Sequence, residues 1–309
     1  MQENTRIKRA IITGATGAIG MALLQELIAC GTEVLVLCRE GSVRNTQIPQ
    51  HPLIRTMECS LDKISELVTE PLGKYDVFYH FAWEGTTGSA RNDMYLQNRN
   101  VKYALDAVEL AARLGCETFV GAGSQAEYGP VQGKLSPETP TFPVTGYGIA
   151  KLCAGQMTRE RAHQLGMKHI WVRVLSVYGP FDGKQSMVMS GIYRLIDGEI
   201  PAYTKGEQQW DYLFSRDAAR AFRMVGEKGS DGVYCLGSGR VRPLREYMEL
   251  IRRAVDENAQ IGLGKLPYAE NQVMYLCADI QKLTEDTGFR PEVSFEEGIA
   301  ETVKWCREH

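Results

Sequence analysis

The sequence lacks the paired cysteine and histidine spacings that bind metal ions. Its eight cysteines include no Cys-x-x-Cys pair, and its five histidines stand singly along the 309 residues. Several cysteines lie inside apolar or helical runs, as small buried side chains do in proteins of a reducing compartment: Cys30, Cys38, Cys116, Cys153 and Cys235. We therefore predict neither a metal site nor a disulfide framework.

A strongly basic surface and a long apolar run are also missing. The net charge is −3, which gives no electrostatic attraction to nucleic acid or to an anionic membrane. No apolar run approaches the roughly 20 residues that a membrane span requires. Regularly placed glycines in segment 10–24 argue against the apolar core of a signal peptide. We expect a cytoplasmic protein with no nucleic-acid or membrane partner.

Strand and helix patterns alternate through the first half of the chain. Strands are expected over 8–13, 33–38, 53–59, 76–82, 117–123 and 169–175, and helices over 19–30, 92–114 and 147–164. This alternation predicts an α/β fold, a Rossmann-like doubly wound parallel sheet with helices on both faces.

The pattern changes after residue 174. The elements become shorter, with helical patterns over 216–227, 244–256 and 295–307. We assign residues 1–174 to the sheet domain and residues 175–309 to a smaller C-terminal α+β region that binds substrate. Part of 210–237 is able to return to the first domain.

The stretch TGATGAIG, residues 13–20, lies between the first expected strand and the first expected helix. Gly14, Gly17 and Gly20 permit a tight turn there and allow a phosphate to approach the backbone amides, while the helix N-terminus adds a partial positive charge. The first strand–helix turn of such a sheet is where the pyrophosphate of a dinucleotide binds. We therefore predict dinucleotide binding; the alternative is a merely flexible turn.

The end of the second strand bears on which dinucleotide is bound. In EVLVLCREGS, residues 33–42, no carboxylate stands at the strand end to hold the ribose hydroxyls; Cys38 takes that place, and Glu40 comes two positions late. Arg39 can pair with a 2′-phosphate, the group that distinguishes NADP from NAD. We favour NADP as the cofactor, with NAD as the alternative. The other interpretation of Arg39 is a solvated loop residue.

An acid–base group is indicated by TGYGIAK, residues 145–151. Tyr147 and Lys151 are four residues apart and are therefore neighbours on a helix. A nearby ammonium favours the phenolate form and brings the phenol toward acid–base work near neutral pH. Ser124, in GAGSQAEYG, follows the fifth strand at the sheet edge where ligands bind, and its hydroxyl can bond the reacting oxygen. The alternatives are a helix start with a surface lysine and an ordinary loop serine.

Together with HFAW, VRVLSVYGP and the closing GFRPEVSFEEGIAETVKW, these motifs resemble the extended short-chain dehydrogenase/reductase family over the whole chain. This is the group of nucleotide-sugar epimerases, dehydratases and reductases. The resemblance implies a catalytic set of Ser124, Tyr147 and Lys151. With Arg39 added from the strand end, the expected cofactor contacts are Gly14, Ala15, Thr16, Gly17, Ala18, Ile19, Gly20, Arg39, Ser60, Leu61, Phe81, Ala82, Trp83, Asn100, Tyr147, Lys151 and Val177.

Several positions depart from the family pattern. Gln125 and Ala126 stand where the dehydratases of the family carry Asp and Glu, so elimination of water lacks its acid–base pair. Trp210 replaces the arginine that commonly meets the substrate diphosphate, and Arg240 or Arg242 is a candidate to take over that role. Ser60 replaces the usual adenine-contacting Asp. The resemblance implies substrate contacts at Trp83, Glu84, Ser124, Gln125, Ser176, Tyr178 and Trp210.

HFAWEG and GSQAEYG are most similar to reductases of 4-keto-6-deoxy sugars. We therefore expect an NADP-dependent reductase of a nucleotide-activated 4-keto-6-deoxy sugar, with hydride transfer to the keto carbon and Tyr147 as proton donor. An NAD-dependent nucleotide-sugar epimerase with a retained cofactor is the close alternative. A non-catalytic dinucleotide-sensing protein is the alternative from another class, although a sensor has no need of the tyrosine–lysine pair.

The resemblance also implies a quaternary structure. Members of the family commonly dimerise through two long helices, which here correspond to 100–114 and 148–164. We expect a homodimer in which small residues let these helices approach closely: Ala104, Ala107, Ala111, Ala150 and Ala154. The alternative is that these alanines pack against the chain's own sheet.

Overall fold

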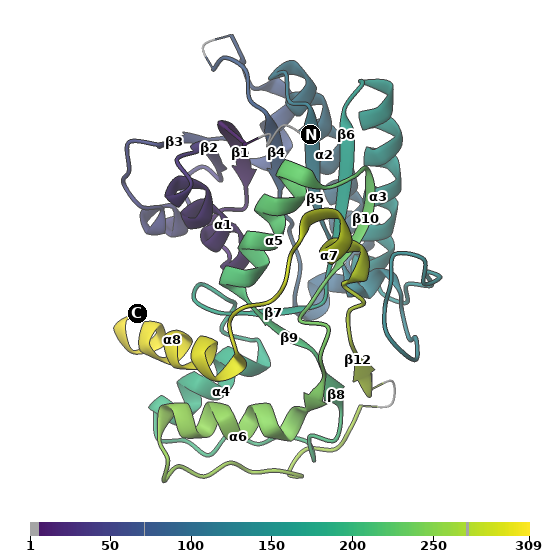
Figure 1. The fold of residues 1–309 in the computed structure, drawn as a ribbon. Coiled ribbons are helices and arrows are strands. Elements are labelled where there is room, and N and C mark those ends of the chain that lie inside the picture. The colour runs from purple at the N-terminus through teal and green to yellow at the C-terminus, as the bar shows by residue number, and fades with distance from the viewer. Residues whose placement is uncertain (1–5, 71, 270–271) are drawn as a thin grey trace.

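A parallel sheet of seven strands forms the centre of the molecule, in a computed structural model that describes residues 6–70, 72–269 and 272–309 (Figure 1). The six strands expected from the sequence are present, which confirms the α/β fold, and one further strand extends the sheet. In spatial order the strands are β10 (Gly232–Leu236), β6 (Lys168–Val174), β5 (Thr118–Ser124), β4 (Val77–His80), β1 (Arg9–Thr13), β2 (Glu33–Cys38) and β3 (Ile54–Glu58).

Helices cover both faces of this sheet (Figure 1). The four helices are α1 (Ala18–Ala29), α5 (Ser215–Lys228), α2 (Met94–Arg113) and α3 (Gly146–Gln164). Ile12 faces the layer formed by α1 and α5, whereas its neighbour Ile11 faces the layer formed by α2 and α3. Successive strand residues point to opposite faces, so an uninterrupted apolar run such as AIIT serves both layers.

The strand order reverses beside β1. After β1 the chain runs outward through β2 and β3, then crosses to the other side of β1 and continues through β4, β5 and β6. In an open parallel sheet the crevice at such a reversal, outside the carboxyl ends of the strands, is the place where ligands bind. The glycine stretch after β1 and the motifs after β4 and β5 therefore meet at one edge.

The C-terminal region forms a second core below that edge (Figure 1). Tyr178, Phe214 and Phe295 pack together at its centre, with ring centroids 4.6 to 5.5 Å apart for the pairs that include Tyr178. Of its helices, α4 was not expected from the sequence. The elements are α4 (Met187–Ile196), α6 (Leu244–Val255), α8 (Phe295–Glu308), β7 (Ser176–Tyr178), β9 (Tyr212–Phe214), β8 (Gln209–Trp210), β11 (Arg242–Pro243) and β12 (Tyr275–Leu276).

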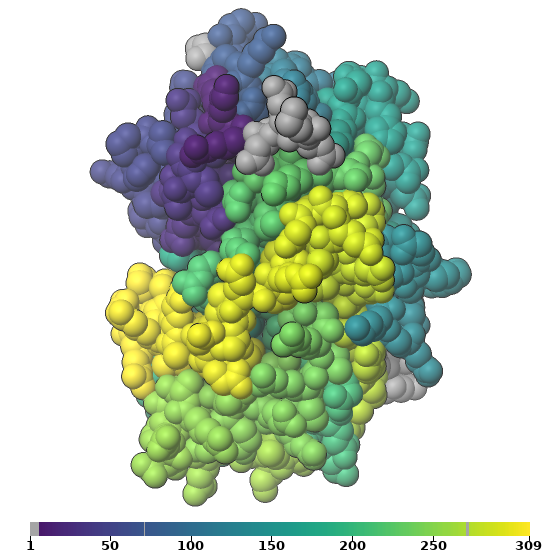
Figure 2. Space-filling view, viewed as in Figure 1, coloured from purple at the N-terminus to yellow at the C-terminus, as the bar shows by residue number. Residues whose placement is uncertain are grey.

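Segments of the second half return to the sheet. Helix α5 packs on α1, and β10 pairs with β6 along its whole length. Helix α7 (Gln281–Thr287), also not expected from the sequence, packs against α5 and β10. Figure 2 shows the C-terminal segment, in yellow, lying across the front of the molecule over both halves.

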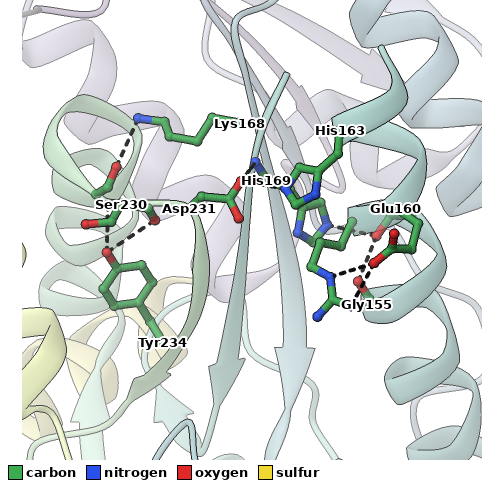
Figure 3. Close-up of polar contacts among 11 residues, drawn as sticks. Gly155, Glu160, His163, Lys168, His169, Ser230, Asp231 and Tyr234 are labelled. Carbon is green, nitrogen blue, oxygen red and sulfur yellow. Dashed lines mark hydrogen bonds and ion pairs between the residues drawn. The ribbon is translucent and has the colours of Figure 1, made fainter. Parts of the chain in front are cut away.

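Polar side chains hold β10 at the edge of the sheet (Figure 3). The Oδ2 atom of Asp231 accepts a hydrogen bond from the backbone N–H of His169 (2.8 Å) and lies 2.9 Å from Nε2 of His163 on α3. Nε2 of His169 lies 2.9 Å from Oγ1 of Thr158, and burial lowers the pKa of His169 to about 4. These bonds join α3, β6 and the start of β10.

The five alanines expected at a subunit interface are instead buried inside the chain. Ala104, Ala150 and Ala154 pack around Trp171, and Ala107 and Ala111 belong to the core beneath α2. Their role as interface residues was wrong; they allow α2 and α3 to pack closely against each other and against the sheet. Within the described residues, no helix is both long enough and apolar enough to cross a membrane.

Candidate active site

Two adjoining cavities, of about 590 and 320 Å³, lie at the carboxyl edge of the sheet. Gly14, Gly17, Phe81 and Trp83 line both, so the two cavities form one elongated cleft across β1. The larger cavity extends over the ends of β2 and β3, and the smaller one extends over β5 and the start of α3. Most of the expected cofactor residues line this cleft.

The glycine stretch shapes the middle of the cleft. Gly14 has a φ of 75°, and a Cβ atom there would lie 2.6 Å from the backbone nitrogen of Ala82, so only glycine fits. Gly20 lets the first turn of α1 pack on the loop, since a Cβ atom there would lie 2.2 Å from the Gly14 oxygen. Gly17 is different: the nearest atom to its Cβ position is 3.9 Å away, and it caps the open end of α1. This end of a helix, facing a cavity, fits a dinucleotide pyrophosphate.

Two basic side chains line the end of the cleft beside β2. Arg39 lines it, and so does Arg44, from the short helix η1 (Val43–Gln47), which the sequence did not single out. Glu40 points elsewhere and forms an exposed ion pair with Lys63, 3.5 Å away. Ser42 and Asn45 complete this part of the wall, and the Asn45 amide donates to the backbone oxygen of Arg39 (2.9 Å).

The segment after β3 lines the same cavity. Ser60 and Leu61 lie where the sequence placed them. Asp62 also lines the cavity, and the sequence analysis did not name this carboxylate. An acidic side chain is therefore present beside β3, displaced along the chain.

The segment after β4 is fixed by polar residues of α2. Phe81, Ala82 and Trp83 line the cleft as expected. Asn100 lies outside its wall: the Asn100 amide accepts from the Glu84 backbone N–H (3.0 Å) and donates to the Glu84 carbonyl (2.9 Å). Both ends of the amide hold the cleft wall, so any support that Asn100 gives the cofactor is through Glu84, and this role stays a prediction.

Ser124, Tyr147 and Lys151 come together in the smaller cavity. Nζ of Lys151 donates to the carbonyl of Ala122 (2.8 Å) and lies 3.7 Å from the centroid of the Trp83 ring. Burial lowers the pKa of Lys151 to about 7. Two elements supply the set: β5 ends at Ser124, and α3 begins just before Tyr147. Both reach the same edge of the sheet, beside the segment that follows β4.

The ionisation of Tyr147 differs from the expectation that Lys151 governs it. Burial raises the pKa of Tyr147, while a hydrogen bond with Ser124 and the charge of Arg91 lower it. The Cζ atom of Arg91 lies 4.3 Å from the centroid of the Tyr147 ring, whereas Nζ of Lys151 lies 5.8 Å away. The cation nearest the phenol ring is thus Arg91, which the sequence analysis did not name.

Glu127 lies directly behind Ser124 and is fully buried. Its Oε1 atom accepts from the Ser124 backbone N–H (2.8 Å) and from Nε1 of Trp171 (3.0 Å), and its Oε2 atom accepts from Nε of Arg173 (2.7 Å). Arg173 is also buried. The carboxylate is therefore locked on the sheet side of Ser124, and its place in GSQAEYG was the signal that could have identified it.

Only some of the residues expected to contact the substrate line the cleft. Glu84 lines the larger cavity, whereas Gln125, Ser176 and Trp210 lie outside the walls of both cavities. Nε1 of Trp210 donates to Oγ of Ser176 (2.9 Å). Tyr178 is buried in the C-terminal core, where its hydroxyl donates to a backbone carbonyl, so its expected substrate contact was wrong.

Arg240 and Arg242 do not reach this cleft. They line a separate cavity of about 870 Å³ together with residues 290–295, and Arg242 forms an ion pair with Glu296 at 2.7 Å. They therefore lie apart from the cleft that holds Ser124, Tyr147 and Lys151, and a role for either of them at the substrate diphosphate stays a prediction. Asp182, by contrast, lines the smaller cavity beside Val177, and the sequence analysis missed it.

The model of the NAD dependent epimerase/dehydratase family matches residues 10–237, which is more than half of the chain. The chain belongs to this family. The match covers the glycine stretch, all seven strands of the sheet except the first residue of β1, and the three catalytic candidates. It confirms the resemblance to the extended short-chain dehydrogenases, and with it an NAD(P)-dependent enzyme of the oxidoreductase and epimerase type.

Relatives within the family carry several activities. A dTDP-glucose 4,6-dehydratase of Streptomyces niveus is 26% identical over 322 residues, covering 97% of this chain and 93% of the relative. A dTDP-4-dehydro-6-deoxyglucose reductase of Escherichia coli is 28% identical over 200 residues, 62% of each chain. A solved UDP-N-acetylglucosamine 4-epimerase from Methanobrevibacter ruminantium M1, in complex with UDP-N-acetylmuramic acid, superposes with a TM-score of 0.87. Its identity is 22% over 98% of this chain and 99% of that one, a likeness of fold.

Proposed function

We propose that this family member is an NADP-dependent reductase of a nucleotide-activated 4-keto-6-deoxy sugar. The observation that carries the proposal is the pair of arginines, Arg39 and Arg44, that line the cleft beside β2, where Glu40 is paired with Lys63. Asp62 lines the same cavity from the segment after β3. Two guanidinium groups suit the 2′-phosphate of NADP. An enzyme that draws hydride from NADPH and releases NADP⁺ performs a net reduction.

The smaller cavity supports reduction of a carbonyl group. The bound dinucleotide supplies the hydride. Tyr147 is placed to give a proton to the carbonyl oxygen as negative charge develops on it, and Ser124 lies beside Tyr147 to hydrogen-bond the same oxygen. The Ala126 backbone N–H donates to Oγ of Ser124 (3.2 Å), so the serine O–H is left to donate, either to the Tyr147 oxygen or to the carbonyl oxygen of a substrate.

Dehydration is disfavoured by the residues after Ser124. Positions 125 and 126 hold Gln125 and Ala126, neither of which can accept and return a proton. Glu127 is the first carboxylate after them, and it is committed to Arg173 and Trp171 on the far side of Ser124. The similarity to dTDP-glucose 4,6-dehydratases therefore does not extend to the acid–base pair.

Calorimetric titration of the cofactor-stripped protein tests the cofactor. We expect NADP⁺ to bind at least about tenfold more tightly than NAD⁺, and Arg39→Ala to lose about ten- to hundredfold of the NADP⁺ affinity with NAD⁺ binding unchanged, the strength of a charge-assisted contact. Arg55→Ala, an exposed arginine on β3, is the matched control. Tight NAD⁺ that resists stripping would instead support an epimerase.

Turnover tests the reaction itself. With NADPH and a panel of nucleoside diphosphate 4-keto-6-deoxy sugars, stoichiometric oxidation of NADPH is the expected result. Interconversion of a nucleotide sugar and its epimer without net NADPH consumption would contradict the reductase assignment. Binding of the dinucleotide with no turnover of any sugar would favour the sensing alternative.

We also propose that the chain is a cytoplasmic homodimer that meets its partner through α2 and α3. Although the alanines of these helices are buried, four apolar side chains on them are exposed: Met94 (56%), Tyr95 (84%), Ile149 (50%) and Met157 (45%). Burying such side chains between copies is favourable. Sedimentation velocity at micromolar concentration is expected to show a dimer that Ile149→Glu with Met157→Glu dissociates; a wild-type monomer would refute the proposal.

A further inference from the structure

The segment between β4 and α2, residues 83–93, forms a strap that is fastened to α2. Gln97, which is 1% exposed, donates from Nε2 to the carbonyls of Gly85 and Ala90, both at 2.9 Å. Its Oε1 atom accepts from Nε1 of Trp83 (2.9 Å). The buried amide of Gln97 thus binds the strap at three residues, Trp83, Gly85 and Ala90. The Trp83 ring is the one that Nζ of Lys151 contacts.

The same strap is fastened to the start of α3, the helix that carries Tyr147. Oδ1 of Asn92 accepts from the backbone N–H of Gly146 (3.0 Å), and Asp93 caps α2. The strap contacts Gly146 so closely that a Cβ atom there would lie 3.0 Å from the carbonyl oxygen of Arg91. The Asn92–Gly146 hydrogen bond and this close backbone contact therefore hold the segments that carry Arg91 and Tyr147 side by side.

Arg91, in the short helix η3 (Gly88–Asn92), brings a permanent positive charge to the Tyr147 ring. Its Cζ atom lies 4.3 Å from the ring centroid, and its Nη1 atom donates to the carbonyl of Thr86 (2.9 Å). Thr86 lines the catalytic cavity. In the described part of the chain, no carboxylate forms an ion pair with Arg91, so its charge is not neutralised by a neighbour.

The charges around Tyr147 come from several elements. Burial is the largest cause that raises the pKa of the Tyr147 phenol, and the charge of Glu127 on η4 (Gln125–Glu127) raises it further. The charge of Arg91 lowers it. Lys151 on α3 directs its Nζ atom toward the Trp83 ring and the Ala122 carbonyl. Asp182 lines the same cavity from the loop after β7. Of these groups, Arg91 is the cation in face contact with the phenol ring.

We propose that Arg91 is a positioning residue for Tyr147: it holds the phenol ring from one face and stabilises the phenolate formed when the proton is given up. The inference rests on the proposed function. In reduction of a keto group the hydride forms the C–H bond, the phenol O–H bond breaks, and its proton forms the new alcohol, so Tyr147 is left as an anion. A fixed guanidinium beside that anion lowers the free energy of the charged product state.

The experiment titrates Tyr147 directly, without cofactor or substrate. Protein labelled with ¹³C at the tyrosine Cζ is followed by NMR from pH 7 to 11, and the Tyr147 resonance is assigned by its loss in Tyr147→Phe. Arg91→Gln keeps a donor for the Thr86 carbonyl but removes the charge, and Arg91→Lys keeps the charge. Arg99→Gln, at an exposed arginine of α2, is the matched control.

The expected result is a Tyr147 titration that moves upward by about one pH unit in Arg91→Gln, returns toward the wild type in Arg91→Lys, and stays unchanged in Arg99→Gln. Equal titration in Arg91→Gln and the wild type overturns the proposal, and so does a wild-type Tyr147 that shows no onset of ionisation by pH 11. The NMR titration does not depend on turnover, so the two proposals are tested separately. If Tyr147 shifts in Arg91→Gln but the separate turnover assay finds no NADPH oxidation with any sugar, the proposed function is rejected and the role of Arg91 stands.

Discussion

Replacing Tyr147 with phenylalanine is expected to lower kcat for carbonyl reduction by about 10²- to 10⁴-fold, the range for a lost general acid. The substitution removes only the hydroxyl group. The ring keeps its edge contact with Trp83, centroids 6.2 Å apart, and its face contact with Arg91. Affinity for the dinucleotide is therefore expected to change little, since the glycine stretch and the arginines of the cleft are untouched.

The measurement is steady-state NADPH oxidation, with calorimetry of cofactor binding on the same preparation. Tyr268→Phe is the matched control, because the Tyr268 hydroxyl donates to Glu207 in the C-terminal region and lines neither cavity of the cleft. Turnover of Tyr147→Phe at the wild-type rate, with cofactor still bound, would remove Tyr147 from the reaction. Loss of cofactor binding in Tyr147→Phe would instead show that the hydroxyl group acts in binding.

Replacing Glu127 with alanine is expected to lower the free energy of unfolding by about 3–5 kcal/mol, the cost of leaving one partner of a buried ion pair alone. The charged guanidinium group of Arg173, which is only 6% exposed, would be left in the interior without the carboxylate that pairs with it. The Trp171 N–H and the Ser124 backbone N–H would also lose their acceptor. Because Ser124 depends on that bond for its place, we expect kcat to fall as well.

Urea denaturation at constant m-value measures the change in stability. Glu109→Ala breaks the exposed ion pair with Arg161 and is the matched control, with an expected cost of no more than about 1 kcal/mol. The double variant Glu127→Leu with Arg173→Met removes both charges and is expected to be more stable than Glu127→Ala. A Glu127→Ala protein as stable as the Glu109→Ala protein would contradict the buried pair.

Local sequence patterns were sufficient to predict much of the fold and to place the acid–base candidates on their elements. The apolar runs of β1 and β2 predict strands because they are short and rich in β-branched residues. The stretch TGATGAIG, between a strand and a helix, predicts the glycine turn. The four-residue spacing of Tyr147 and Lys151 places both on one face of α3 whatever surrounds the helix. These features depend on residues close together in the chain, so the sequence is enough to read them.

Other features depended on which distant segments meet. The seventh strand, β10, pairs with β6, and the hydrogen bonds of Asp231 to His163 and His169 hold its start there. Tyr178 belongs to a motif that runs along the cleft, yet the packing of Phe214 and Phe295 draws its side chain into the C-terminal core. Neither outcome is encoded within the short windows from which strand and site were predicted.

The sequence by itself determined six strands of the sheet, the glycine turn and the tyrosine, lysine and serine that meet at the edge of β5. Only the tertiary structure decided their electrical surroundings: Arg91 over the phenol ring, the ammonium of Lys151 turned toward Trp83, and Glu127 locked behind Ser124 by Arg173. The physical reason is that periodicity and turn chemistry act between near neighbours in the chain, whereas the field at a buried group is set by every charge near it in space.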